Sequence, residues 1–387
     1  MNGLHSSAIR DLLTLTARPD IISLAGGLPD PSFIPRERIA REIDSVLTDP
    51  GSVQYGETTG IRVLRSVLAE REGARIGRSL DPAEVVVTHG SQQALSLLAQ
   101  ALVDPGDVVI VEDPAYTGAL QVFRTAEAEV IGVPLDADGM DVTALESMLA
   151  SGVRPALVHT VSNFHNPRGV VLSAERRIAL AGLADRYGFW VIEDDPYGQL
   201  WFDAPTPDPV AAHSDRVIRL SSASKVLAPA LRVGWMHGNR EVCAAVELLK
   251  QGADLCGSSL TQQVAAGLLA DEEWFGAHLS ELRSRYGARA RALVSAVESE
   301  FADRVSVTPA GGGMFCWVQF ADHGIDTHAL LQTAIEHGVA FVPGSAFAVR
   351  ADLDSELRLC FATSPEEALQ DAVRRLRLAY DDWSAQS

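Results

Sequence analysis

The sequence predicts an α/β protein whose core is a mainly parallel sheet, with a smaller α+β region toward the C-terminus. Two observations predict the sheet: short runs rich in valine and isoleucine alternate with helical patterns, and these runs are apolar almost throughout. Strands of this kind are typical of parallel sheets that helices cover on both faces. The smaller region is predicted by a change of character after about residue 275.

The clearest unit of the predicted sheet lies at residues 84–103. "EVVVTHG" is strand-like and ends in Gly90, and "SQQALSLLAQALV" then has apolar residues at helical spacing. Ser91 can cap the N-terminus of that helix. The order is therefore strand, tight turn and helix. Further strand-like runs follow at residues 107–116, 155–167, 189–198 and 216–225.

The C-terminal part has a different pattern. Residues 272–301 are charged and predict one extended helix, whereas "GGGMFCWVQF", "VAFVPGSAF" and "ELRLCFA" predict strands of an α+β region. We therefore expect a large domain at residues 46–275 and a small C-terminal domain at 276–387. Residues 1–45 are expected to form an N-terminal arm and part of the small domain.

Composition excludes several classes of protein. The net charge of −19 argues against a nucleic-acid partner, because phosphate binding needs a basic face. The N-terminus lacks the pattern of a signal peptide, and the uncharged stretch at residues 90–103 is too short to span a bilayer. A cytoplasmic protein without membrane contact is expected. No metal site is expected, because the cysteines lack metal-ligand spacing; they are Cys243, Cys256, Cys316 and Cys360.

Polar residues follow each predicted strand, where parallel α/β sheets bind their ligands. The first strand is followed by a turn into a helix, which suits a phosphate. The residues in chain order are Ser91, Gln92, Tyr116, Asn166, Asp194, Tyr197, Ser222, Ser224, Lys225 and Arg232.

Taken singly, most of these residues have a plainer interpretation. Gly90 and Ser91 suit an ordinary turn and helix cap, and "NPRG" is a good β-turn sequence in its own right. Asp194 precedes Asp195 and a proline, so it could simply end an element. Lys225 could be a surface lysine on a loop. The argument for a site depends on the occurrence of all of them in order.

In that order the residues resemble a known family. "IRDLLTLTARPDIISLAGGLPDPSFIP", "QYGETTGIRVLR", "THGSQQAL", "EDPAYTG", "NFHNPRG", "IEDDPYG", "SSASKVLAPALRVGW", "KQGADL", "GGGMFCW" and "LRLCFA" cover nearly the whole chain. Together they resemble the class I/II aminotransferases, pyridoxal-phosphate enzymes of fold type I, and within them the 2-aminoadipate and aromatic aminotransferase subgroup. The resemblance implies an aspartate aminotransferase-like fold, with a seven-stranded-type sheet in the large, cofactor-binding domain.

The resemblance also implies catalytic roles around pyridoxal 5'-phosphate. Lys225 would form the internal aldimine and then move the proton at Cα, which a lysine with a lowered pKa can do. Asp194 would pair with the pyridinium nitrogen, so that the ring can accept electrons. Tyr197 and Asn166 would hydrogen-bond the ring O3′.

Other residues would hold the cofactor from the sides. Tyr116 would stack on the ring, and the phosphate would be bound by Ser91, Gln92, Ser222, Ser224 and Arg232. Tyr55, in "QYG", matches a tyrosine that reaches the phosphate of the neighbouring subunit. The resemblance therefore implies a homodimer with shared active sites.

The substrates implied are an L-amino acid and a 2-oxo acid. Arg358 matches the arginine that binds the substrate α-carboxylate, with Asn166 beside it and Gly27 where backbone approaches that carboxylate. Arg10 matches a position that can meet an acidic side chain, although it could equally be a surface residue of a helix. No metal is implied.

The sequence also departs from the family pattern. His165 and Arg168 stand where many relatives have glutamine and threonine, and His89 precedes the phosphate turn. His165 could point toward the cofactor or away from it. These departures leave the expected cofactor residues unchanged, but they argue against transferring any relative's substrate to this chain.

Two alternatives to transamination remain. The same lysine and aspartate can support oxidation, elimination, decarboxylation or cyclisation, because all of these begin with a Cα carbanion. A non-catalytic sensor of this fold is the other alternative. We expect it less, because the resemblance begins by about residue 8, without room for a DNA-binding domain, and because the chain is acidic.

Overall fold

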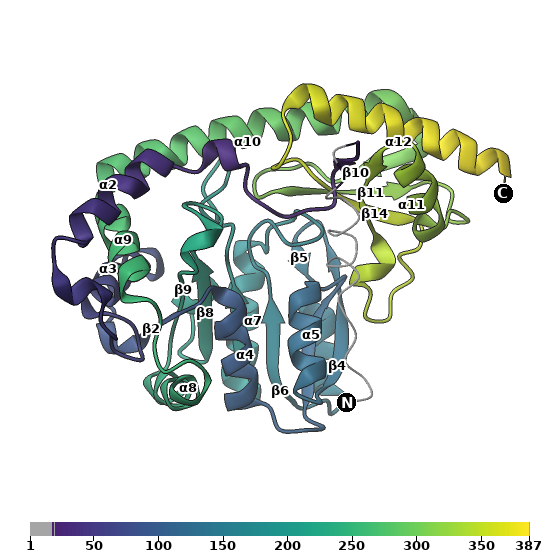
Figure 1. Ribbon diagram of the computed structural model, residues 1–387. Helices are drawn as coiled ribbons and strands as arrows, with labels where there is room; N and C mark the ends of the chain where they lie inside the picture. Colours follow the sequence, from purple (N-terminus) through teal and green to yellow (C-terminus); the bar gives the residue numbers. More distant parts are fainter. Residues whose placement is uncertain (1–17, 19, 387) are drawn as a thin grey trace.

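The computed structural model describes residues 18 and 20–386 of the chain (Figure 1). An eight-stranded sheet forms the centre, in the order β2-β9-β8-β7-β6-β3-β4-β5. Its strands are β2 (Val85–Thr88), β3 (Val108–Asp113), β4 (Glu129–Asp136), β5 (Gly139–Met140), β6 (Pro155–Thr160), β7 (Trp190–Asp194), β8 (Val217–Ser222) and β9 (Gly234–His237). The α/β class with a mainly parallel sheet is confirmed, and the two-residue strand β5 extends the expected seven strands to eight.

Five of these strands were predicted from apolar runs, namely β2, β3, β6, β7 and β8. Neighbours in the run from β8 to β4 pair in parallel. Strand β9 is antiparallel to both β2 and β8, so β2 and β8 point the same way. The carboxyl ends of all five predicted strands therefore meet at one edge of the sheet.

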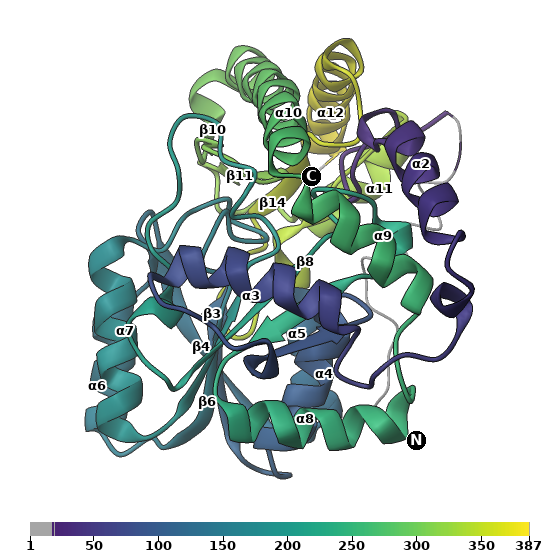
Figure 2. The same ribbon diagram turned by 90° about the vertical axis from the view of Figure 1, so that its left-hand side faces the viewer.

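Helices cover both faces of the sheet (Figure 2). Alternating residues of β3 show the two layers: Val109 and Val111 pack with α4, α5 and α8, whereas Ile110 packs with α6 and α7. This alternation explains why the strand is apolar throughout. The helices are α4 (Ser91–Leu102), α5 (Thr117–Thr125), α6 (Val142–Ala150), α7 (Ala174–Tyr187) and α8 (Arg240–Ala253).

Three further helices lie beside the sheet on the side of β2, and the last of them directly precedes the longest helix in the chain. They are α2 (Arg36–Val46), α3 (Arg62–Ile76) and α9 (Ser259–Ala270). The expected long helix is α10 (Glu272–Phe301), and the side chain of Asp271 caps its start by accepting a hydrogen bond from the Trp274 amide. In Figure 1, α10 and α12 (Glu366–Gln386) run side by side above the large sheet.

A four-stranded sheet of order β10-β11-β14-β13 lies beneath these two helices (Figure 1). Its strands are β10 (Val305–Val307), β11 (Phe315–Phe320), β13 (Val342–Pro343) and β14 (Glu356–Cys360), with α11 (Thr327–Glu336) beside them. Strand β1 (Ile22–Ser23) pairs with β12 (Val339–Ala340), so an early segment joins this C-terminal region. Throughout residues 18 and 20–386, no helix is both long and apolar enough to cross a bilayer.

Candidate active site

A cavity of about 580 Å³ lies at the carboxyl edge of the large sheet. Twelve of the fourteen residues predicted from the sequence line it: Gly27, Ser91, Gln92, Tyr116, Asn166, Asp194, Tyr197, Ser222, Ser224, Lys225, Arg232 and Arg358. Most of them follow the ends of β2, β3, β6, β7 and β8, whereas Gly27 follows β1, Arg232 precedes β9 and Arg358 lies on β14. Residues up to 331 positions apart in the chain, Gly27 and Arg358, are thereby brought to one site.

Lys225 lies in the loop between β8 and β9 and is partly buried. Its Nζ donates a 2.7 Å hydrogen bond to the carbonyl oxygen of Gly27. Burial lowers the pKa of Lys225 to about 8, because the charged form loses its hydration. A substantial fraction of the amine is therefore neutral near physiological pH, as a nucleophile or a base requires.

Asp194 is the last residue of β7, and its side chain is 5% exposed. Its Oδ2 lies 3.6 Å from Nε2 of His159 on the neighbouring strand β6. Its Oδ1 is buried without a hydrogen-bond partner among the described residues. Because a buried carboxylate oxygen without a donor is costly, this atom is suited to accept a hydrogen bond from a ligand in the cavity.

The turn between β2 and α4 forms one end of the cavity. Gly90 has φ +85°, and a Cβ there would lie 2.8 Å from the guanidinium of Arg232. Arg232 donates a 2.6 Å hydrogen bond to the carbonyl of His89 and so lies against this turn. The hydroxyls of Ser222 and Ser224 lie 2.9 Å apart in the same cavity. Free N–H groups, hydroxyls and a guanidinium together suit a phosphate.

Tyr116 precedes α5 and lies across one wall of the cavity. Its hydroxyl donates a 3.1 Å hydrogen bond to Oε1 of Gln92, and burial raises the pKa of Tyr116 to about 12. Gly118 makes this position possible, since a Cβ there would lie 2.5 Å from Cζ of the tyrosine ring. The ring therefore folds back over the first turn of its own helix.

Arg358 on β14 also lines the cavity and is buried, and its guanidinium lies 4.2 Å from the ring centre of Phe315. It donates hydrogen bonds to Oδ1 of Asn166 at 2.6 Å and to the carbonyl of Ala25 at 2.5 Å. Its Nε has no partner among the described residues. Burial lowers the pKa of Arg358 to about 10, so the group stays charged at neutral pH and suits a carboxylate ligand.

Tyr197 lies in the turn after β7 and is 5% exposed. Its ring makes an edge contact with Phe315, and burial raises the pKa of its hydroxyl. The hydroxyl is therefore protonated at neutral pH and can donate a hydrogen bond into the cavity.

One predicted residue, Tyr55, is described by the structure but does not line this cavity. Tyr55 is 80% exposed and lines a separate surface cavity with Cys256 and Leu260. It is therefore not among the residues that line the cavity of Lys225. Arg10 lies outside the described residues.

The two histidines that depart from the family pattern both contact acidic residues. Nδ1 of His89 lies 2.9 Å from Oδ2 of Asp254, which also accepts a hydrogen bond from Lys250. His165 is 1% exposed, and its Nε2 lies 3.0 Å from Oε2 of Glu112. Neither side chain is among those that line the cavity of Lys225. His165 therefore points away from the expected cofactor position.

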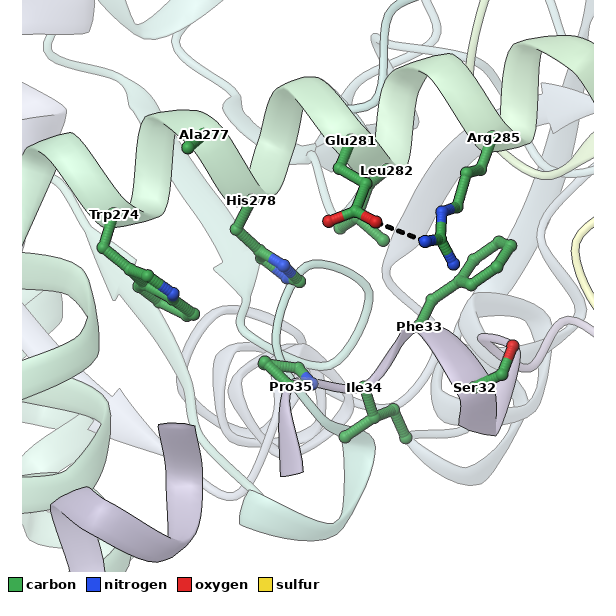
Figure 3. A pocket seen from close by; sticks show the side chains of 10 residues that line it. All are labelled: Ser32, Phe33, Ile34, Pro35, Trp274, Ala277, His278, Glu281, Leu282 and Arg285. Atoms are coloured by element: carbon green, nitrogen blue, oxygen red, sulfur yellow. Dashed lines mark hydrogen bonds and ion pairs between the residues drawn. The ribbon is translucent and has the colours of Figure 1, made fainter. Parts of the chain in front are cut away.

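A smaller cavity of about 310 Å³ lies between α10 and the segment at Ser32–Pro35 (Figure 3). Trp274 and His278 point into it from α10, with their rings stacked at 5.2 Å. Nε2 of His278 lies 2.8 Å from the carbonyl oxygen of Val226, the residue after Lys225. Burial lowers the pKa of His278, so the neutral ring donates from Nε2 and attaches the Lys225 loop to α10.

Sequence reasoning missed several residues that line the main cavity, notably Thr117, Gly118, Gln121 and Phe315. The first three follow Tyr116 on α5, so the first turn of a helix after a predicted strand was the available signal. Phe315 begins the run "FCWVQF", and its apolar side chain gave no sign of a site.

The residues present fit pyridoxal phosphate. The turn at Gly90 with Arg232 suits the phosphate, the amine of Lys225 suits the aldehyde, and the unpartnered oxygen of Asp194 suits a protonated ring nitrogen. All three groups face one cavity.

Comparison with known proteins identifies the family. The model for aminotransferase class I and II matches residues 19–376. The chain is 38% identical over 382 residues to the aromatic-amino-acid aminotransferase 1 of Thermococcus litoralis, covering 97% of this chain and 91% of that protein. It is 37% identical over 380 residues to the 2-aminoadipate transaminase of Thermus thermophilus, with 96% and 93% covered.

A solved structure agrees. The kynurenine aminotransferase of Pyrococcus horikoshii, in complex with PMP, superposes with a TM-score of 0.93 at 38% identity, over 98% of this chain and 96% of that one. The chain therefore belongs to the class I and II aminotransferases, enzymes that use pyridoxal phosphate to transfer an amino group.

Proposed function

We propose that the cavity around Lys225 is the active site at which this aminotransferase moves the α-amino group of an L-amino acid to a 2-oxo acid. The observation that carries the proposal is the convergence of three groups on one cavity: the Lys225 amine, the unpartnered Asp194 oxygen and the Arg358 guanidinium. They supply a nucleophile, an acceptor for a ring nitrogen and a carboxylate site.

The cofactor is held by residues from several strand ends. Asp194 would accept a hydrogen bond from the ring nitrogen, Tyr197 and Asn166 would hydrogen-bond the ring oxygen, and Tyr116 would stack on the ring. The phosphate would be bound by Ser91, Gln92, Ser222, Ser224 and Arg232. When bound, pyridoxal phosphate supplies an aldehyde that takes the amino group and a ring that accepts the electrons left at Cα.

Lys225 is the general base that takes the proton from the substrate Cα. Its lowered pKa leaves Nζ able to accept the proton from the substrate Cα and to return it. Arg358 binds the α-carboxylate, with Asn166 and Gly27 beside it, and so orients the Cα–H bond toward Nζ. Apolar groups of Leu28 and Phe315 border the remaining space, which suits the side chain of an aromatic or aliphatic amino acid.

The active enzyme is a cytoplasmic homodimer. Tyr55 is exposed and does not line the cavity of Lys225, which is consistent with a contact to the phosphate site of a second subunit. Val53 and Leu255 are also exposed on this side and offer apolar area for the contact. We infer that the chain divides into residues 1–45, 46–275 and 276–387, and the pairing of β1 with β12 supports placing the early segment with the small domain.

The test is a panel of L-amino acids mixed with the purified holoenzyme, with Lys225→Ala as the inactive control. Conversion of the cofactor to pyridoxamine phosphate with release of a 2-oxo acid is expected for at least one donor. The panel includes phenylalanine, kynurenine and 2-aminoadipate, after the names of the relatives. Release of ammonia or peroxide in place of pyridoxamine phosphate would overturn transamination in favour of elimination or oxidation.

A further inference from the structure

The loop that carries Asn166 lies between β6 and α7, and contacts hold it on two sides. Within the loop, the amide of Gly169 donates a 2.6 Å hydrogen bond to the carbonyl of His165. The amide of His165 donates to the carbonyl of Val170 at 2.8 Å. Asn166 therefore lies at the tip of a closed turn, and its position depends on what holds that turn.

His165 attaches one side of the turn to the large sheet. Its Nε2 lies 3.0 Å from Glu112, the residue before the end of β3. The Glu112 carboxylate also accepts hydrogen bonds from the Thr160 hydroxyl at 2.6 Å and from the Val161 amide at 3.0 Å. This side of the turn is therefore fixed to two neighbouring strands of the sheet.

Arg168 attaches the other side of the turn to the four-stranded sheet. Its Nη1 lies 3.4 Å from Oε2 of Glu356, and its guanidinium lies 5.9 Å from the ring centre of Trp317. The Trp317 indole also donates a hydrogen bond to Glu356. The side chains of Arg168 and Glu356 are 22% and 8% exposed, so their attraction is less screened by water than that of a surface pair.

Strand register places these contacts beside Arg358. Trp317 on β11 is the Cα partner of Arg358 on β14, and Glu356 precedes Arg358 by two residues. Side chains two positions apart, or directly opposite each other, share one face of a sheet. Arg168 and Asn166 therefore contact the same face of β11 and β14, Arg168 through Glu356 and Asn166 through Arg358.

We propose that Arg168 is a positioning residue for substrate binding. Through Glu356 and Trp317 it holds the Asn166 turn against the strand that carries Arg358, and so keeps the guanidinium directed at the substrate carboxylate. The inference rests on the proposed role of Arg358 as the carboxylate site. It gives a function to one of the departures from the family pattern.

If the ion pair of Arg168 and Glu356 only stabilised the fold, its removal would have a different effect from the one that a positioning role predicts. Its loss would lower the melting temperature but leave the affinity of the folded enzyme for carboxylates unchanged. A positioning role predicts that carboxylate affinity falls while the cofactor stays bound, because Asn166 is the one proposed cofactor residue on this turn, whereas Lys225, Asp194 and the phosphate residues lie on other strand ends. The binding measurement therefore separates the two roles.

The experiment compares holoenzymes carrying Arg168→Met, Arg168→Lys, Glu356→Gln, and Arg168→Met with Glu356→Gln together. Arg186→Met is the matched control, because Arg186 also pairs with a glutamate, Glu146 at 3.3 Å, but on the exposed surface. The probe is 3-phenylpropanoate, a carboxylate that has no amino group and cannot react. Its dissociation constant is measured by calorimetry, and cofactor affinity and melting temperature are measured in parallel.

For Arg168→Met and for Glu356→Gln we expect the dissociation constant of the probe to rise about three- to tenfold. The double variant should be no worse than either single variant, because both remove one coupled contact. Arg168→Lys should fall between Arg168→Met and the wild type. The cofactor affinity of all these variants should equal that of the wild type. The Arg186→Met control should also bind the probe with wild-type affinity.

Unchanged probe affinity in Arg168→Met, or additive losses in the double variant, would overturn the positioning role. The Arg358→Met variant tests the proposed carboxylate site itself. If the wild type and Arg358→Met bind the probe equally, the proposed carboxylate site is wrong and the positioning role falls with it. If only Arg358→Met is impaired, the carboxylate site stands and Arg168 has no part in it.

Discussion

Oδ1 of Asn166 accepts a 2.6 Å hydrogen bond from Nη1 of Arg358, which lies 192 residues further along the chain. The carbonyl of Ala25 accepts a second hydrogen bond, from Nη2. The guanidinium thus has its direction fixed by acceptors from two distant segments. A group held in this way loses little conformational freedom when a ligand binds, which favours affinity.

Replacing Arg358 with methionine should weaken binding of the amino acid without releasing the cofactor. Hydrogen bonds to charged groups contribute about 1.5–3 kcal/mol, so KM should rise roughly 10- to 100-fold. Arg358→Lys keeps the charge but loses the planar fork, so a smaller rise is expected. Steady-state kinetics and the cofactor absorbance check both points. Loss of cofactor from Arg358→Met would contradict the assigned role.

Covalent trapping can locate the cofactor unambiguously, because the chain contains two lysines, Lys225 and Lys250. Nζ of Lys250 contacts both carboxylate oxygens of Asp254, at 2.7 and 2.9 Å, and its side chain is 0% exposed. Borohydride reduction of the holoenzyme should therefore attach the pyridoxyl group to Lys225 alone. Peptide mass spectrometry gives the site, and Lys250 is the internal control. A label on Lys250 would be incompatible with the proposed site.

The lowered pKa of Lys225 predicts how cofactor capture depends on pH. Burial lowers this pKa from 10.5 to about 8, so below pH 8 the amine of the cofactor-free protein is mostly protonated and cannot attack an aldehyde. The rate of pyridoxal phosphate capture should rise with a midpoint near pH 8 and approach a plateau above about pH 9. Stopped-flow absorbance across pH 6–10 measures it. A midpoint close to 10 would show an amine that burial does not perturb.

The lowered pKa of Lys225 also makes the free energy of unfolding depend on pH. Between pH 8 and 10.5 the unfolded chain holds a proton on Lys225 that the folded chain has lost. The free energy of unfolding should therefore increase with pH across this window, and Lys225→Met should remove that part of the increase. Urea unfolding of the cofactor-free protein at several pH values measures the difference. Identical pH profiles of the two proteins would contradict the shift.

Much of the site could be predicted because its residues follow strands that are recognisable locally. Asp194 ends an apolar run, and Lys225 follows another, so parallel topology alone brings them to one edge. Strand β9 was not predicted, because it has only four residues and their sequence shows no alternation of apolar and polar side chains. The contact of His278 with Val226 was also not predictable, since it depends on how α10 packs 52 residues away.

Gly118 was missed for a related reason, and it offers the sharpest steric test. Its place in "AYTGAL" reads as the first turn of a helix, and only the fold of the Tyr116 ring over that turn makes a side chain impossible. A Cβ at 118 would lie 2.5 Å from Cζ and 2.6 Å from the hydroxyl oxygen of Tyr116. Gly118→Ala must therefore move the ring and break its 3.1 Å hydrogen bond to Gln92.

If Tyr116 stacks on the cofactor, Gly118→Ala should weaken pyridoxal phosphate binding about three- to tenfold, the range that a lost aromatic contact gives. Gly182→Ala on α7 is the matched control, because no atom of the described residues outside this stretch of the helix lies within 4 Å of the added Cβ. That change should leave cofactor affinity unaltered and raise the free energy of unfolding by about 0.5–1 kcal/mol. Equal cofactor affinities in the two variants would mean that Tyr116 does not carry the ring contact, and the stacking wall would then have to be sought on another side of the cavity.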